Sequence, residues 1–222
     1  HLWEGRVLLA RMNPYAAPPD DSVYDPLRQE LEQAGDDLYS GRWLKHASVR
    51  STYGPVATAL FTIPHLPDIG RTLSLRIIMT LFDLGTIVLL IHLLRALSFP
   101  PLMVVVYAWS PVCVNGFANR GQVDAAMVFF VVLAVLLVVR KRLAWAGVAF
   151  AAALLTKISP LLLLLPMFRR GRWKFAVGCL VAGLVGIAPF AGAGLEGLEG
   201  FFEFAGRWRR NDSAYSVIYA VL

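Results

Sequence analysis

The sequence predicts an all-α protein that crosses a membrane several times. The chain is 57% hydrophobic and 16% charged, with a mean hydropathy of +0.60, whereas soluble globular proteins have about 45–50% apolar and about 25% charged residues. Several apolar runs approach the ~20 residues that a spanning helix needs. A polar cluster separates two of these runs, and charged groups at the edge of a hydrocarbon layer usually mark a functional surface.

The net charge of +6 is read as a signal of membrane topology, and it gives no support to nucleic-acid binding. Residues 1–70 contain nine acidic and six basic side chains, whereas the remainder contains six acidic and fifteen basic ones. Seven of the latter lie in two short loops, at 140–142 and 169–174. Short loops rich in Lys and Arg mark the cytoplasmic side, so both loops are predicted to be cytoplasmic.

Composition divides the chain into three regions. Residues 1–72 are polar and proline-rich, so we expect an external loop domain with a short amphipathic helix over 25–38. Residues 73–191 form the predicted transmembrane region, and 192–222 form an external loop and the start of a further span. Within the transmembrane region, spans are expected over 73–97, 101–117, 124–139 and 175–191.

Residues 143–168 are expected to form a hairpin. A single helix here would place the two basic loops on opposite sides of the membrane, against the positive-inside tendency. Pro160 disfavours helical geometry at the preceding residue and removes a backbone donor, so a break at 156–160 is favoured. Lys157 would then lie at the external tip. A single helix is the alternative that the sequence leaves open.

This topology gathers polar side chains on the external face. They are Asn115, Asn119, Arg120, Gln122 and Asp124 between two spans, and Lys157 in the hairpin. An ammonium below the membrane surface needs an anionic partner, either a ligand phosphate or a carboxylate such as Asp124. Asp124 also begins a span, where a carboxylate can satisfy free N–H groups. Asp83 lies within the first span and needs a partner, which we expect on another helix.

Several short motifs are informative through their order. They are His1-Leu-Trp-Glu-Gly-Arg-Val7, Asn13-Pro-Tyr15, Tyr53-Gly-Pro-Val56, Ser110-Pro111, Gly121-Gln-Val-Asp124 and Leu155-Thr-Lys-Ile-Ser-Pro160. The set resembles the bacterial GT-C-type glycosyltransferases, in particular the family 87, mannosyltransferase-like members. Gly54 departs from the family's commoner Tyr-Pro-Pro, and the family's upstream acidic pair would lie before His1. We therefore expect a fragment that lacks at least one earlier span.

The resemblance implies a polytopic helical bundle of the GT-C type with a large external loop, in the bacterial plasma (inner) membrane. It implies an enzyme that moves a hexose, mannose being the first expectation, from a polyprenyl-phosphate donor to a lipid or glycan acceptor on the external, periplasmic side. Such transfer needs a carboxylate to deprotonate the acceptor and cations to stabilise the leaving phosphate. We assign the first role to Glu4 and the second to Lys157, Arg120 and Arg6. Substrate-binding or site-shaping roles are assigned to Asn13, Tyr15, Tyr53, Asn119, Gln122 and Asp124.

Two other functions make different predictions. A transporter or lipid flippase would distribute polar residues through the membrane depth and show an internal repeat, and neither pattern is visible. A membrane scaffold would not need polar groups gathered on one face. No cofactor motif and no metal-ligand spacing occurs, although the acidic loop leaves a divalent cation possible. A basic aromatic patch at 207–210 is read as an interfacial anchor, or as a phosphate or sugar contact.

Overall fold

The computed structural model describes residues 2–36, 38, 44, 46–66, 69–167, 173–200 and 202. Within these ranges every regular element is helical and no strand occurs, which confirms the predicted all-α class. The chain divides into two compact units, His1–Met12 with Tyr53–Ala191 (unit 1) and Asn13–Thr52 with Gly192–Leu222 (unit 2). The predicted loop domain of residues 1–72 is thus shared between the units, and its position outside a membrane stays a prediction.

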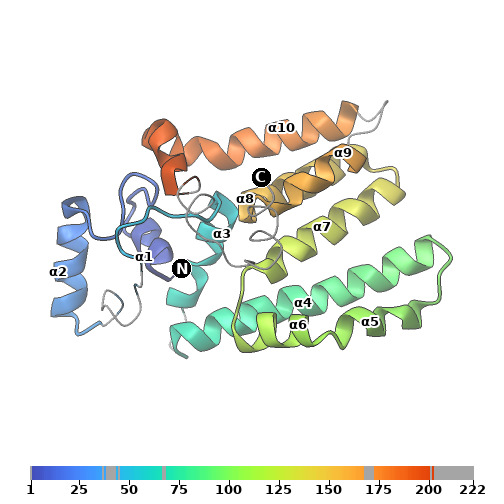
Figure 1. The fold of residues 1–222 in the computed structure, drawn as a ribbon, viewed down its shortest axis with the longest axis horizontal. Coiled ribbons are helices and arrows are strands. Elements are labelled where there is room, and N and C mark those ends of the chain that lie inside the picture. Colours follow the sequence, from blue (N-terminus) through green and yellow to red (C-terminus); the bar gives the residue numbers. More distant parts are fainter. Residues whose placement is uncertain are drawn as a thin grey trace, which may run out of the picture. The chain divides into compact units, whose positions relative to one another are not determined.

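Long apolar helices form most of unit 1 (Figure 1). α4 spans Arg71–Ala96, and α10 spans Trp173–Ile187. α4 and the helical stretch Trp173–Gly194 are each long and apolar enough to cross a membrane. The pair Pro101–Ala108 and Pro111–Asn119 is bent by 51° and is a third candidate if it forms one span. The described part of the chain therefore has two candidate spans, or three with the bent pair.

The bend in this pair follows from its prolines. Its elements are η4 (Pro101–Val104), α5 (Val105–Ala108), α6 (Pro111–Cys113) and the π-helical η5 (Val114–Asn119). Pro111 cannot donate a backbone hydrogen bond and disfavours helical geometry at Ser110, whose ψ is 120°. π-helical segments are frequent at functional sites, and η5 leads directly into the polar turn before α7.

α7 (Asp124–Val139) and α8 (Leu143–Thr156) continue the bundle. They run antiparallel across the turn at 140–142, and the turn between α4 and η4 lies at the same end (Figure 1). α8 and α10 run side by side in the same direction (Figure 1). A Cβ on Gly147 of α8 would lie 2.1 Å from the carbonyl oxygen of Phe175 in α10. Small residues at such positions allow helices to pack backbone to backbone in lipid.

The chain reverses direction after α8. Lys157 is extended, with φ −156° and ψ 143°, and η6 (Ser159–Leu163) and α9 (Leu164–Met167) run back along α8 (Figure 1). Met167 belongs to the same buried cluster as Ala146 of α8. The segment is therefore two arms joined near Lys157 and is not a single helix. Its orientation in a membrane stays a prediction.

Two short helices join the N-terminal segment to the bundle. α1 (Leu2–Leu9) packs against the end of α3 (Pro55–Leu60). A Cβ on Gly5 would lie 2.0 Å from the carbonyl oxygen of Phe61, so the α1 backbone approaches that turn directly. α3 in turn contacts α8. Unit 1 thus links the helix that carries Glu4 to the helix that ends beside Lys157.

Unit 2 contains the amphipathic helix α2, Asp25–Gln33. Leu27 and Leu31 are buried on one face, as their spacing predicted. The helix ends earlier than expected because Gly35, with φ +69°, provides the left-handed residue that commonly terminates helices. The phenolic hydroxyl of the buried Tyr24 donates a 2.7 Å hydrogen bond to the Asn13 carbonyl, which holds the loop against the start of α2.

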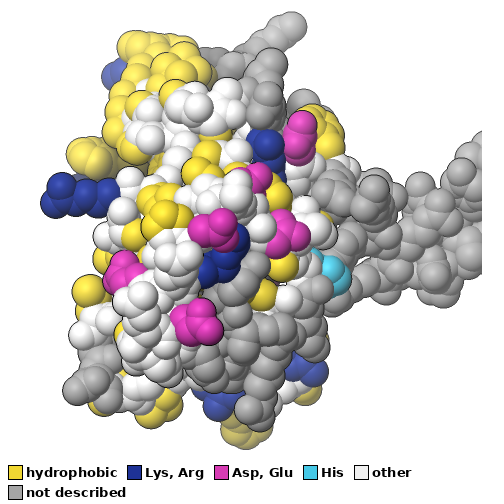
Figure 2. Space-filling model, turned by 90° about the vertical axis from the view of Figure 1, so that its left-hand side faces the viewer, with side chains coloured by type: hydrophobic (Ala, Val, Ile, Leu, Met, Phe, Trp, Pro, Cys, Tyr) yellow, Lys and Arg dark blue, Asp and Glu magenta, His cyan; other side chains and the backbone are white. Residues whose placement is uncertain are grey.

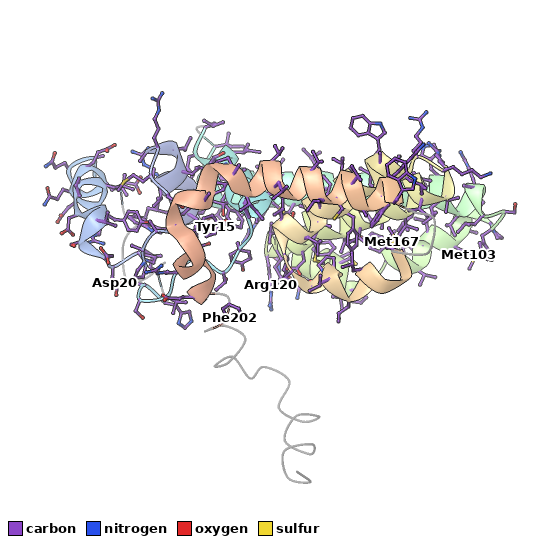
Figure 3. The ribbon with its side chains drawn as sticks, turned by 90° about the horizontal axis from the view of Figure 1, so that it is seen from above. Tyr15, Asp20, Met103, Arg120, Met167 and Phe202 are labelled. Carbon is purple, nitrogen blue, oxygen red and sulfur yellow. The ribbon has the colours of Figure 1, made fainter. Side chains whose placement is uncertain are left out.

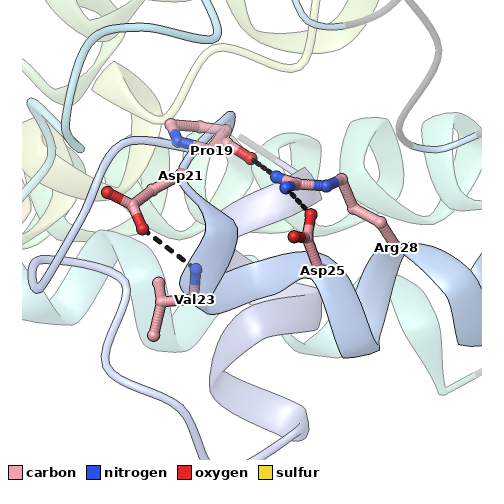
Figure 4. Close-up of polar contacts among 5 residues, drawn as sticks. All are labelled: Pro19, Asp21, Val23, Asp25 and Arg28. Carbon is pink, nitrogen blue, oxygen red and sulfur yellow. Dashed lines mark hydrogen bonds and ion pairs between the residues drawn. The ribbon is translucent and has the colours of Figure 1, made fainter.

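Polar contacts fix the loop that leads into α2 (Figure 4). The Asp21 carboxylate accepts from the Val23 N–H at 2.9 Å. Arg28 donates to the Pro19 carbonyl at 2.6 Å and pairs with Asp25. Figure 2 shows that acidic side chains on this side of the molecule are separated by uncharged and basic groups. Asp21 and Asp25 thus stabilise the local structure, and the visible face carries no continuous acidic patch.

Candidate functional site

An ion pair joins the start of α7 to the residue that follows α8. Lys157 Nζ lies 2.7 Å from Asp124 Oδ1, and the two side chains are 39% and 31% exposed. Asp124 lies in the first turn of α7 without capping it. The expected need for an anionic partner at Lys157 is met here by a protein carboxylate. An ammonium has three N–H donors, so Lys157 keeps donors for a ligand on its exposed side.

A backbone contact and a side-chain contact hold the residues on the two sides of Lys157. The Gly54 N–H donates to the Thr156 carbonyl at 3.4 Å, and a Cβ on Gly54 would lie 2.1 Å from the Leu155 carbonyl oxygen. On the other side, Ser159 Oγ donates to Met127 Sδ at 3.1 Å. The tip is therefore attached to the segment before α3 and to the first turns of α7.

The polar turn between η5 and α7 directly precedes Asp124 of this pair in the sequence. Gly121 has φ +64° and lies against Leu75 and Arg76 of α4, which attaches the turn to a long helix. Asn119 Nδ2 donates to Asn115 Oδ1 at 3.0 Å. The exposed Asn and Gln amides of this turn are groups that hydrogen-bond well to sugar hydroxyls.

Gln122 and Arg120 are two further exposed residues of this turn. The backbone of Gln122 donates to the Gly116 carbonyl at 3.0 Å, and its side-chain Oε1 lies 3.0 Å from where a Gly116 Cβ would be. Arg120 is exposed, and Figure 3 shows it away from the bundle end that Met103 and Met167 mark. That end carries the basic turn at 140–142, so Arg120 lies toward the opposite end from this predicted cytoplasmic loop.

Glu4 and Arg6 lie on α1, and both are half-buried and interact with neighbours. Their helix contacts Phe61 through Gly5. Tyr53 packs edge-on against the same phenylalanine, with ring centroids 5.5 Å apart. The next residue, Gly54, contacts Leu155 and Thr156 at the end of α8. A continuous path of contacts thus runs from the α1 backbone to Lys157 within unit 1. Tyr53 and Lys157 are each one residue away from the hydrogen bond between Gly54 and Thr156.

Comparison with models of known protein families identifies the family of this chain. Residues 52–217 match the model of glycosyltransferase family 87. The chain belongs to glycosyltransferase family 87. The comparisons with curated proteins and with solved structures found no match. Family membership and the long apolar helices together indicate an integral membrane glycosyltransferase.

The family 87 match includes the polar turn, the Lys157 region and Tyr53, whereas Glu4, Arg6, Asn13 and Tyr15 lie before it. Asn13 and Tyr15 belong to unit 2. Asn13 Oδ1 accepts from the Tyr15 N–H at 3.0 Å, and the Tyr15 side chain is buried. These contacts stabilise the loop, and a substrate role for either residue stays a prediction.

One polar pair within the apolar helices involves a residue that sequence analysis missed. Tyr107 of α5 donates a 2.7 Å hydrogen bond from its hydroxyl to Asp83 Oδ1 of α4. The expectation that Asp83 has its partner on another helix is confirmed. A tyrosine in an apolar run is an unremarkable residue in sequence, and only the packing of α5 on α4 reveals its role.

Two predictions from the sequence remain, the basic aromatic patch and a divalent-cation site. The basic aromatic patch at 207–210 lies outside the described residues. Among the residues that the structure describes, no group of three or more His, Cys, Asp or Glu side chains is placed to hold a metal ion.

Proposed function

We propose that the protein transfers a hexose, with mannose as the first candidate, from a polyprenyl-phosphate donor to a hydroxyl of a lipid or glycan acceptor. The reaction takes place on the external, periplasmic side of the bacterial plasma membrane. One observation carries the proposal: a partly exposed lysine at a chain reversal pairs with Asp124, which directly follows a turn rich in exposed polar groups. This region falls within the family 87 match.

Lys157 is the proposed contact for the donor phosphate. During transfer the bond between the sugar's anomeric carbon and the phosphate oxygen breaks, and its electron pair stays on the phosphate. A fixed cation stabilises the charge that develops there. Arg120 and Arg6 are proposed as additional phosphate contacts. Arginine suits this role because its planar group presents several donors to phosphate oxygens.

Glu4 is the proposed general base. A carboxylate that accepts the proton of the acceptor hydroxyl makes that oxygen a better nucleophile for the anomeric carbon. Glu4 is half-buried on a helix that contacts the Phe61 turn, which supports a fixed position. Asn119 and Gln122 are proposed to hydrogen-bond to sugar hydroxyls, and Tyr53 is proposed to shape the acceptor side.

The arrangement of charge supports the proposed orientation. The basic turn at 140–142 between α7 and α8 lies at one end of the bundle, and the chain reversal after α8 lies toward the other (Figure 1). With the basic end cytoplasmic, Lys157, Arg120 and the polar turn face the external side. A donor carried by a polyprenyl chain reaches such a site from the membrane.

The test is sugar transfer by membranes that contain the full-length protein, supplied with labelled polyprenyl-phosphate-mannose and lipid acceptors. Wild type is compared at matched expression with Lys157→Ala, Glu4→Gln and the control Arg140→Gln, which removes a cation from the opposite end. Transfer should be lost in the first two variants and kept in the control. If the wild type transfers no sugar from mannose, glucose or arabinose donors, the proposal is wrong and a transporter or flippase becomes the better hypothesis.

A further inference from the structure

Asp124 pairs directly with Lys157, the residue proposed to bind the donor phosphate. We propose that Asp124 makes this site selective for the singly charged phosphodiester of the donor over the more highly charged phosphomonoester that remains after transfer. The inference rests on the proposed function and adds a specificity-determining residue to it.

The geometry requires any phosphate on Lys157 to approach Asp124. The Lys157 ammonium and the Asp124 carboxylate are 2.7 Å apart, and both are about one-third exposed. A phosphate oxygen that bonds to the same ammonium at the usual ~2.8 Å lies within roughly 5.5 Å of the carboxylate. The contacts of Gly54 with Thr156 and of Ser159 with Met127 hold the residues on both sides of Lys157, so the ion pair with Asp124 starts from a defined position.

The consequence is a penalty on each additional negative charge. A phosphodiester carries a single charge, whereas a phosphomonoester carries about −1.5 to −2 at neutral pH. Lys157 attracts the additional charge and Asp124 repels it from about twice that distance, so the carboxylate offsets roughly half of the attraction. Without the carboxylate only the attraction remains. Arg120 lies in the turn that precedes Asp124 and attracts both the diester and the monoester. Its attraction for each probe does not depend on whether residue 124 carries a carboxylate.

This selectivity separates donor from product. When the anomeric carbon leaves the phosphate, the electron pair stays behind and the lipid phosphate gains negative charge. Asp124 is then near a more highly charged group than the one that bound. The repulsion favours release of the spent polyprenyl phosphate, so Asp124 limits product inhibition.

The test compares two probes on purified full-length protein in detergent. One is a short prenyl methyl phosphodiester and the other is the matching prenyl phosphomonoester, and Kd is measured for each. Asp124→Asn, which keeps the side-chain shape, is expected to shift the preference toward the monoester by roughly tenfold per added unit charge. Asp124→Glu keeps the carboxylate and should retain the wild-type preference. The control Glu32→Gln removes an exposed carboxylate of α2 in unit 2.

Because each variant is measured with both probes, partial misfolding cancels from the ratio. A shift in Asp124→Asn that is absent in Asp124→Glu and Glu32→Gln supports the inference. An unchanged ratio, or a wild type that binds neither probe, overturns it. If the ratio shifts while the wild type transfers no sugar, the site is selective as described and only the proposed function fails. In an active preparation, Asp124→Asn should also strengthen inhibition by the monoester relative to the donor KM.

Discussion

Gly54 touches the backbone of Leu155 so closely that a Cβ at position 54 would lie 2.1 Å from the Leu155 carbonyl oxygen. The Gly54 N–H also donates to the next carbonyl, that of Thr156. A glycine here lets the segment before α3 lie against the last turn of α8. A proline at this position would remove this donor and place ring atoms where the carbonyl lies.

Gly54→Ala should therefore disturb both folding and the site. Because the contact is with backbone, the methyl group can be accommodated only by moving the segment or the end of α8, at a cost of about 1–3 kcal/mol in stability. Because Lys157 follows Thr156 directly, transfer activity should fall by a larger factor than the loss of folded protein explains. The measurements are thermal unfolding in detergent and transfer by matched membranes.

Gly183→Ala is the matched control, since no atom lies within 4 Å of a Cβ at that position. Its stability should be unchanged or raised by up to about 1 kcal/mol, because alanine is the better helix former. Equal behaviour of Gly54→Ala and Gly183→Ala would show that the 54–155 contact does not constrain the protein.

A second prediction concerns the contact between α8 and α10. Gly147 and Gly178 each face backbone of the other helix, with a Cβ on Gly178 placed 2.1 Å from the carbonyl oxygen of Ala144. Each single change to alanine should lower the unfolding temperature by forcing the helices apart. The double variant should lose less than the sum, because the first substitution already opens the contact that the second needs. Strict additivity would mean that the two glycines act on separate contacts.

The helices that sequence analysis located best are those with sharp chemical boundaries. The bounds expected for the third span, 124–139, coincide with those of α7, because Asp124 and Arg140 bound an unbroken apolar run, although α7 is shorter than the two candidate spans. The first expected span, 73–97, differs from α4 by a residue or two at each end. The amphipathic helix was predicted too long because its apolar spacing continues past Gly35, whose conformation ends the helix.

The sequence predicted a contact within the site only where leaving a charged side chain unpaired would cost free energy. An ammonium near lipid needs an anion, and this argument identified Asp124 as a possible partner of Lys157. The contacts of Gly54 with Leu155 and of Ser159 with Met127 join residues far apart in the chain. Neither periodicity nor composition encodes such pairs, because they depend on how the helices pack. The division of residues 1–72 between two units was invisible for the same reason.

A third prediction concerns the polar pair between α4 and α5. Tyr107→Phe removes the hydroxyl that donates to Asp83 and should cost about 0.5–2 kcal/mol, the range of interhelical hydrogen bonds in membrane proteins. Adding Asp83→Leu removes the carboxylate that has lost its donor, so the double variant should recover part of the loss. The unfolding temperature in detergent measures both effects. If the double variant is less stable than either single one, Asp83 makes a further contact that matters more than Tyr107.

A fourth prediction separates a structural role of Lys157 from a role in binding phosphate. Because both members of the Lys157–Asp124 pair are about one-third exposed, solvent screens the pair, and Lys157→Met should cost about 1 kcal/mol or less in stability. Loss of a cation that stabilises a developing phosphate charge should lower transfer by about 100-fold or more. Denaturant titration in detergent and transfer at matched folded protein provide the two numbers.

The comparison between these two numbers decides the role of Lys157. A small loss of stability with a large loss of transfer places Lys157 at the reacting phosphate. If Lys157→Met instead unfolds as readily as Gly54→Ala while its folded fraction transfers sugar at the wild-type rate, the pair is a structural link between α7 and α8. The donor phosphate would then be held by other cations, and Arg120, exposed in the adjoining turn, would be the next to test by Arg120→Gln.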